Sequence, residues 1–250
     1  KKNSKVKLKI YHKPNLDPYE AMLYGAKRSI NRYVLYSGDD DFIILNAAIK
    51  AANFLNKNKG FSAVTGNSLV FFIKNNSHFG KVERCEEYVQ LENKEKSKIK
   101  RTKLFFSKYN VNLFSVCRKN VFLKSLKIAK IFSKNYSLKA EIMICFGIIF
   151  FGKLKKINDY YLIRQNFTKN KRIQNMTTPG LILKYKNAIK IINKFEKEIS
   201  LYSTDSKEIM KIFINYLKND LANFEKASSL NFKFVKFFYF ILKKLKFIYK

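Results

Sequence analysis

The stretch YVLYSGDDDFIILNAAIKAANFL, residues 33–55, places three adjacent carboxylates between an apolar run and a helix-like segment. Residues 33–36 carry no charge, as expected of a strand that is buried on both faces. After Asp39, Asp40 and Asp41, apolar residues recur at helical spacing. Neighbouring carboxylates repel one another, and each raises the pKa of the next unless a cation or hydrogen-bond donors compensate. A bound group therefore explains the triplet better than the needs of the fold do.

The residues around this stretch alternate between strand and helix patterns. The expected strands are residues 5–11, 33–36, 61–65 and 69–73, and the expected helices are residues 18–29 and 44–56. Asp17 is placed to cap the first helix, whose first turn holds Pro18. Gly66 and Asn67 are expected to turn between the last two strands. Such alternation predicts an α/β protein with an at least partly parallel sheet.

The second half of the chain is predominantly helical in pattern. The expected elements are a charged helix over 83–106, a strand over 111–116, and helices over 122–132, 138–150, 181–199, 205–224 and 232–249. Polar residues, Pro and Gly cluster at residues 177–180, which favours a boundary there. We therefore expect an α/β domain over residues 1–176 and a helical extension over residues 177–250. The apolar run 142–151 is too short to span a membrane and predicts a buried helix.

The chain is strongly basic, with 51 Lys and Arg against 18 Asp and Glu, a net charge of +33. Such a charge attracts nucleic acid or anionic lipid. Only seven of the basic residues are Arg, however, and the forked geometry that reads phosphates and guanines belongs to Arg. Drift in an AT-rich genome explains the lysine excess equally well. Three distant cysteines and two histidines predict reduced thiols and no histidine-based metal site.

Two explanations of the acidic triplet remain open at this point. In open α/β sheets, ligands bind beyond the carboxyl ends of strands, which is where the triplet is expected. Carboxylate oxygens suit Mg²⁺ or Mn²⁺, and Mg²⁺ is commonly shared with substrate phosphates. Alternatively, one Asp caps the following helix and interacts with its dipole. Capping uses one or two carboxylates and leaves the third unexplained.

Four separate stretches resemble one family, the bacterial family 2 type glycosyltransferases of GT-A fold. YGAKRSINRYVLYSGDDDFI (24–43) is similar to their helix, strand and acidic triplet, and GFSAVTGNSLVFF (60–72) to a following strand. LFSVCRKNVF (113–122) resembles a strand ending in Val-x-Arg. AEIMICFGIIFFGKLKKINDYYLIRQ (140–165) resembles a Glu-bearing helix, a Gly-Lys turn and a Tyr-x-x-Arg strand. The resemblance spans about residues 6–166.

The resemblance implies a GT-A-like, Rossmann-like mixed sheet flanked by helices. Family members begin with a further strand and helix that hold the nucleotide base, and the resemblance here starts after that unit. We therefore expect an N-terminally incomplete fold.

The resemblance also implies a function, namely transfer of a sugar from a nucleotide-sugar donor to an acceptor hydroxyl. It implies a hexosyltransferase-like enzyme that inverts the configuration of the transferred sugar. Asp39 and Asp41 would hold Mn²⁺ or Mg²⁺ against the donor diphosphate, and Asp40 would contact the donor sugar or ribose. Glu141 would be the catalytic base that deprotonates the acceptor. Two arginines, Arg118 and Arg164, are candidates for donor binding, with a structural ion pair as the alternative for each.

The C-terminal stretch FKFVKFFYFILKKLKFIYK, residues 232–250, combines six lysines with aromatic residues and no acid. Its lysines fall on one half of a helical wheel, which suits an anionic membrane surface. We expect a cytoplasmic protein, peripheral on the inner face of the cytoplasmic membrane, that glycosylates envelope glycans or lipid-linked acceptors. Two alternatives stay open: a non-enzymatic basic nucleic-acid-binding module, which leaves the triplet unexplained, and a donor-incompetent relative that acts as a scaffold.

Overall fold

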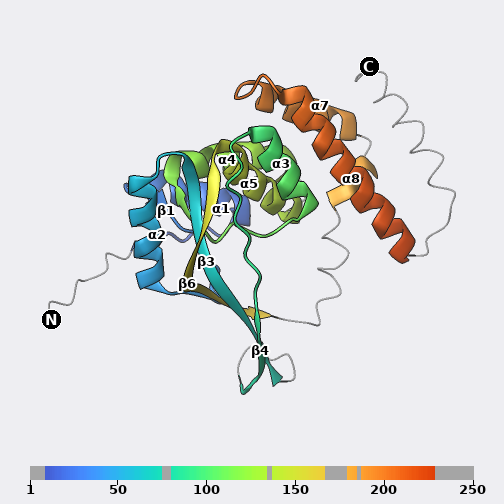
Figure 1. Ribbon diagram of the computed structural model, residues 1–250. Coiled ribbons are helices and arrows are strands. Elements are labelled where there is room, and N and C mark those ends of the chain that lie inside the picture. The colour runs from blue at the N-terminus through green and yellow to red at the C-terminus, as the bar shows by residue number, and fades with distance from the viewer. Residues whose placement is uncertain (1–8, 75–79, 134–136, 167–178, 185–186, 229–250) are drawn as a thin grey trace.

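The protein is an α/β protein built on one mixed sheet (Figure 1). The computed structural model describes residues 9–74, 80–133, 137–166, 179–184 and 187–228. The strands are β1 (Tyr33–Val34), β2 (Asp41–Ile43), β3 (Phe61–Ile73), β4 (Val82–Glu87), β5 (Val116–Arg118) and β6 (Lys153–Asn166). The helices are α1 (Pro18–Arg28), α2 (Leu45–Lys57), α3 (Lys98–Ser107), α4 (Lys119–Ser133), α5 (Ser137–Phe151), η2 (Pro179–Lys184), α7 (Ala188–Ser200) and α8 (Ser206–Ser228).

The order of the strands across the sheet is β1-β5-β3-β6-β2. The long strands β3 and β6 run parallel, whereas β1, β2 and β5 pair antiparallel with their neighbours. Further along β3, past its pairing with β5, the same edge of the strand pairs antiparallel with β4. These two strands form a ribbon that extends away from the helices (Figure 1). The predicted α/β class and the partly parallel sheet are confirmed.

Helices cover the sheet on two sides. α2 packs on β3 and β6 at the left of Figure 1, and α4 and α5 contact the sheet from the other side. Residues 62–66 of β3 are buried without interruption, as expected for a strand that is covered on both faces.

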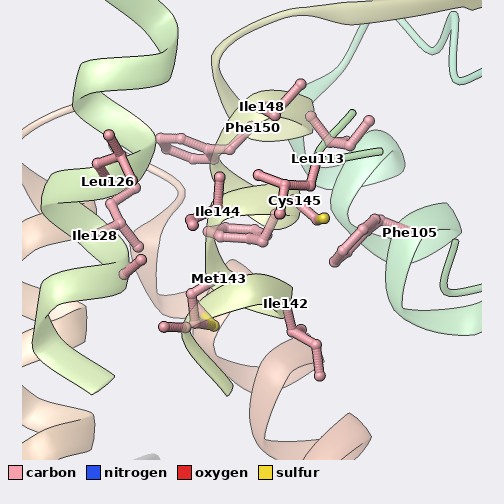
Figure 2. Packing of buried hydrophobic residues seen from close by; sticks show 14 of the residues in the cluster. Phe105, Leu113, Leu126, Ile128, Ile142, Met143, Ile144, Cys145, Ile148 and Phe150 are labelled. Carbon is pink, nitrogen blue, oxygen red and sulfur yellow. The ribbon is translucent and has the colours of Figure 1, made fainter. Parts of the chain in front are cut away.

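Helix α5 is the centre of the core, and Figure 2 shows its side chains packed between α4 and α3. Its residues from Ile142 to Phe150 are buried on every side of the helix, which confirms the predicted core helix. Gly147 allows α4 to approach closely, because a Cβ there would lie 2.7 Å from the Cα of Ser125. The apolar content of α5 is therefore explained by burial inside the protein.

Local sequence signals placed several helices correctly. Asp17 caps α1 by accepting from the backbone N–H of Glu20 over 2.7 Å, and Pro18 opens the helix, as predicted. The helices expected over 44–56, 122–132 and 138–150 are α2, α4 and α5. The helices expected over 181–199 and 205–224 are confirmed in part, since residues 179–184 form the 3₁₀ helix η2 and α7 starts at Ala188.

Four predictions of secondary structure were wrong. The strand expected over 33–36, buried on both faces, is instead the two-residue, half-buried strand β1 at the edge of the sheet, and Leu35 after it is exposed. Residues 61–73 form one continuous strand, and Gly66 is needed because the carbonyl oxygen of Asp159 would lie 2.6 Å from a Cβ there. The charged segment 83–106 is helical only from Lys98, and its first part is the exposed strand β4. The strand expected over 111–116 starts instead at Val116.

Two further expectations concern the ends of the chain. Of the strand predicted over 5–11, residues 9–11 have no regular structure and the remainder lies outside the described residues. The basic C-terminal helix expected over 232–249 also lies outside the described residues. Among the residues that the structure describes, no helix combines the length and apolar character needed to cross a bilayer.

Candidate functional site

The pairing of β2 with β6 brings the acidic triplet to Arg164. Asp41 and Arg164 are direct partners in the antiparallel register, and Arg164 Nε donates to Asp41 Oδ1 over 2.9 Å. The side chain of Asp41 is only 2% exposed. A buried carboxylate of this kind is stabilised in its charged form only when it is paired, as it is here.

Aromatic side chains surround the guanidinium of Arg164. Its Nη1 donates to the hydroxyl of Tyr88 over 3.2 Å, and its Cζ lies 4.3 Å from the ring centroid of Phe114. The ring of Tyr36 packs in turn against Phe114, and the centroids of the two rings lie 5.8 Å apart. The cation is thus fixed by a carboxylate, a phenol and a ring face together.

Tyr36 lies close to four carboxylates at once. Its pKa is raised by burial first and then by the negative charges of Asp41, Glu141, Asp39 and Asp40. The charges of the triplet and of Glu141 therefore both act on Tyr36. The roles predicted from the sequence, metal binding by Asp39 and Asp41 and catalysis by Glu141, stay predictions.

Glu141 is the fifth residue of α5 and lies beyond its first turn. Its Oε1 accepts a hydrogen bond from the hydroxyl of Tyr109 over 3.2 Å. Burial raises the pKa of Glu141, while the Tyr109 hydrogen bond and the charge of Arg164 oppose that rise. A carboxylate whose pKa is raised by burial suits proton transfer near neutral pH.

None of the three aspartates caps the following helix. The N-cap of α2 is Ile44, and no side chain hydrogen-bonds there. Asp41 belongs to strand β2, while Asp39 and Asp40 form the exposed bend before it. The capping explanation of the triplet is therefore wrong.

Asp40 and Asp41 direct one oxygen each at the same point in space. A Cβ added to Gly38 would lie 2.8 Å from Asp40 Oδ1 and 2.9 Å from Asp41 Oδ2. The absence of a side chain at Gly38 leaves room for both oxygens beside this residue. Hard carboxylate oxygens that meet in this way fit Mg²⁺ or Mn²⁺ chemically.

The fit to a cation is limited by the role of Asp41. Its Oδ1 accepts from Arg164, and its Oδ2 accepts from the backbone N–H of Gly38 over 3.3 Å. Within the described part of the chain, no three His, Cys, Asp or Glu residues are grouped as a set of metal ligands. A cation at this place would therefore bind the two exposed aspartates, Asp39 and Asp40, with only the second oxygen of Asp41.

The structure does not bring Arg118 to this site. Its guanidinium donates to the carbonyl oxygens of Leu55, Asn58 and Phe61 over 2.6, 3.0 and 2.7 Å. These three bonds hold the end of α2 against the start of β3. Arg164 alone of the two predicted arginines lies beside the acidic triplet.

A hollow of about 550 Å³ adjoins the site between α1 and the chain that leads from β1 to the triplet. Tyr36 and Ser37 form its edge nearest to the aspartates, and Met22, Ala26 and Phe122 contribute apolar walls. Tyr36 and Ser37, which line this ligand-sized space, come just before Gly38 and Asp39 in the sequence. Its volume falls in the range of small-molecule sites.

Sequence reasoning did not identify the aromatic members of the site. Tyr36, Tyr88, Tyr109 and Phe114 come from four different segments; Tyr36 stands beside the triplet, and Phe114 lies in the stretch LFSVCRKNVF (113–122). The position of Tyr36 three residues before Asp39 is the one signal that could have found it. Tyr88 and Tyr109 are brought in by long-range packing alone.

No protein-family model matches this chain, and no curated protein matches it significantly in sequence. The resemblance to glycosyltransferases therefore depends on the four stretches of the sequence alone.

Proposed function

We propose that the protein is a metal-dependent glycosyltransferase that moves a sugar from a nucleotide-sugar donor to an acceptor hydroxyl, with GT-A as its fold. The observation that carries this proposal is the convergence of the triplet, Arg164 and Glu141 around Tyr36. Distant parts of the sequence supply these groups, and a purely structural role would not need four carboxylates together.

The exposed end of the triplet is the place for a divalent cation and the donor diphosphate. Asp40 Oδ1 and Asp41 Oδ2 both lie near Gly38, and Asp39 is exposed in the bend just before them in the chain. A cation bound there would offset the negative charge that develops on the leaving diphosphate. The hollow at Tyr36 and Ser37 would then receive part of the donor.

Glu141 is the proposed base for the acceptor hydroxyl. A base accepts a proton efficiently when its pKa lies near the working pH, and burial moves the pKa of Glu141 in that direction. Tyr109 holds one carboxylate oxygen, so the other remains for the acceptor. The positive charge of Arg164 keeps a fraction of Glu141 ionised, which a base requires.

A donor-incompetent relative that acts as a scaffold is the second candidate, and one observation favours it. Asp41 is already neutralised by Arg164 and is almost fully buried, so the triplet offers a cation fewer oxygens than three free carboxylates would. In that case the cluster would stabilise the sheet without binding a diphosphate.

Titration of the protein with a panel of UDP-, GDP- and dTDP-hexoses, with and without Mn²⁺, separates the two candidates. The transferase predicts Mn²⁺-dependent binding that the Asp39→Asn, Asp40→Asn double variant abolishes. The matched control is Glu83→Gln, which removes an exposed carboxylate on β4 and should bind as the wild type does. Absence of binding to every donor at millimolar concentration would contradict the transferase and favour the scaffold.

A further inference from the structure

The hollow between α1 and the chain that leads to the triplet differs in composition from the rest of the protein. Its volume is about 550 Å³, and none of the described residues that line it is charged. The whole chain, in contrast, carries 51 Lys and Arg and 18 Asp and Glu. In the proposed transfer the donor meets only the end at Tyr36 and Ser37, so the remainder of the hollow is unassigned.

Small residues of α1 create this space. Ala21, Gly25 and Ala26 line the hollow, and a Cβ added at Gly25 would meet nothing within 4 Å. Pro18 and Ser29 line it as well, so the hollow follows α1 for about 16 Å at a rise of about 1.5 Å per residue. Ala21 and Gly25 are exposed. The hollow is therefore a long groove that is open to the surface.

The walls of the hollow offer apolar contacts and few hydrogen bonds. Tyr33, Tyr36 and Phe122 contribute rings to the lining. The hydroxyl of Tyr33 already donates to Asn56 Oδ1 over 2.7 Å. A charged ligand would lose its water here without meeting a partner for its charge. A hydrocarbon chain, in contrast, gains about fourfold in affinity for each methylene group that it buries.

The end of the hollow at Ser37 is acidic. Residues 29–32 join α1 to β1, and the chain from Tyr33 to Ser37 then runs back along the same hollow. The acidic triplet follows Ser37. Asp17 and Glu20 stand at the start of α1. The carboxylates around the hollow therefore belong to this end.

The other end of the hollow is basic. Lys119 Nζ donates to the carbonyl oxygen of Ser29, and the backbone N–H of Lys119 donates to that of Arg32 over 2.9 Å. Lys27 and Arg28 are the last residues of α1. No acid occurs between residues 21 and 38, and α4, which begins with Lys119, contains none. Four cations therefore gather where α1 ends.

Exposed apolar side chains surround the same basic end. Ile30 follows Ser29 and is 93% exposed, and Leu35, which lines the hollow, is 36% exposed. The ring of Tyr11 is also exposed, and its centroid lies 5.7 Å from Arg28 Cζ. Exposed apolar residues that are grouped with Lys and Arg suit a surface that rests on an anionic bilayer.

We propose that the hollow binds the hydrocarbon chain of a membrane lipid, taken from an anionic bilayer on which the basic end rests. The chain passes Ile30 and Leu35, and the polar head of the lipid lies at the acidic end, beside the triplet. The inference deepens the proposed transfer by making a lipid the acceptor, and it rests on that function only for the role of the head. Chain binding is measured without donor or Mn²⁺, so the two ideas can fail separately.

Calorimetric titration of the protein with octyl, decyl and dodecyl maltoside, each below the concentration at which it forms micelles, tests chain binding. One molecule should bind per protein, and its affinity should rise about fourfold with each added methylene group. Uridine, which represents the base of a nucleotide-sugar donor, should not compete. Affinity that is independent of chain length, or displacement of the maltoside by uridine, would overturn the assignment to a hydrocarbon chain.

Gly25→Leu locates the bound chain. The new side chain fills the open space at Gly25, and leucine is a better helix former than glycine. The matched control is Gly60→Leu, at an exposed glycine outside the lining, where only the flexible end of Lys153 lies within 4 Å. We expect decyl maltoside to bind Gly25→Leu at least tenfold more weakly and Gly60→Leu as it binds the wild type. Equal binding to the two variants would place the chain elsewhere and overturn the inference.

Sedimentation with vesicles of phosphatidylcholine and phosphatidylglycerol in equal parts tests the docking end. Ile30→Asn removes an apolar side chain at the basic end, and Leu45→Asn removes one that is 68% exposed on α2. We expect Ile30→Asn to weaken vesicle binding about tenfold and Leu45→Asn to leave it unchanged. Equal effects of the two variants, or none from Ile30→Asn, would mean that another surface rests on the bilayer and would contradict the proposal.

Discussion

Asp41 and Arg164 face each other across β2 and β6, and Arg164 Nε lies 2.9 Å from Asp41 Oδ1. The side chains are 2% and 28% exposed. Because β2 has only three residues, this ion pair is a main interaction that holds the end of the triplet to the sheet. The position of Asp39 and Asp40 therefore depends on it.

Arg164→Met should destabilise the fold by about 3 kcal/mol, because it leaves the carboxylate of Asp41 buried without a cation. Urea denaturation measures the change. Lys50→Met is the matched control, since Lys50 pairs with Asp159 on the same strand but is 62% exposed. Its loss should cost less than about 1 kcal/mol. Similar costs for the two variants would contradict a buried role for the Arg164 pair.

The stability of the protein should depend on the ionisation of Glu141. Burial raises the pKa of Glu141 above its ordinary value of 4.5. At a pH between 4.5 and the raised pKa of the folded state, the folded protein keeps a proton that the unfolded chain has released. Stability therefore falls as the pH rises through this window. Glu141→Gln cannot ionise and keeps the acceptor for Tyr109. We therefore expect the variant to gain stability relative to the wild type as the pH rises through this window.

Urea midpoints of the wild type and Glu141→Gln, measured from pH 4 to pH 8, give this difference directly. A constant difference across the range would mean that Glu141 ionises normally in the folded protein. The same variant should lose sugar transfer at every pH, because an amide cannot act as a base.

Local signals explain the parts of the fold that the sequence predicted well. The cap at Asp17 and the helical spacing of apolar residues in α2, α4 and α5 act within a few residues, so they are readable without knowing the partners. The position of the triplet before a helix was equally local. Arg164 was a candidate through the resemblance, but its bond to Asp41 and the bond of Tyr109 to Glu141 are formed only by tertiary packing.

Long-range contacts explain the errors. Gly66 carried a turn signal, yet it serves the close approach of β6, which no local pattern records. The charged segment of β4 lacks alternation because all six of its residues are exposed. Arg118 resembled a ligand-binding residue, but three carbonyl groups from a distant segment occupy its guanidinium.

Gly66→Ala should destabilise the sheet by roughly 1–3 kcal/mol, because the new Cβ would meet the backbone of Asp159 and the Cβ of Tyr161, each 2.6 Å away. Gly60→Ala is the matched control on the same segment. There the nearest atom is the flexible Lys153 Cε at 3.4 Å, so little change is expected. Thermal unfolding of both variants decides the point. Tolerance of alanine at position 66 would argue against the close β3–β6 pairing.

Arg118→Met should lower stability without changing the intrinsic affinity for a donor. Three hydrogen bonds to carbonyl groups are lost, two of them to the end of α2, and a cost of about 2 kcal/mol or more is expected. Arg164→Met, in contrast, should also weaken Mn²⁺-dependent donor binding at temperatures where both variants are folded. Calorimetric titration at such a temperature distinguishes them. Equal loss of donor affinity in Arg118→Met and Arg164→Met would mean that Arg118 contributes to donor binding.

Gly38→Ala tests whether the converging oxygens of Asp40 and Asp41 hold the cation. The methyl group would lie within 3 Å of both oxygens, and Asp41 is tied to Arg164, so the exposed Asp40 must move away. Mn²⁺-dependent donor binding should weaken at least tenfold while the urea midpoint stays nearly unchanged. Gly60→Ala is the control, because a Cβ there meets only the flexible Lys153 side chain, at 3.4 Å, and Gly60 does not line the hollow. Unimpaired Mn²⁺-dependent binding in Gly38→Ala would mean that any cation is held by Asp39 without this pair of oxygens.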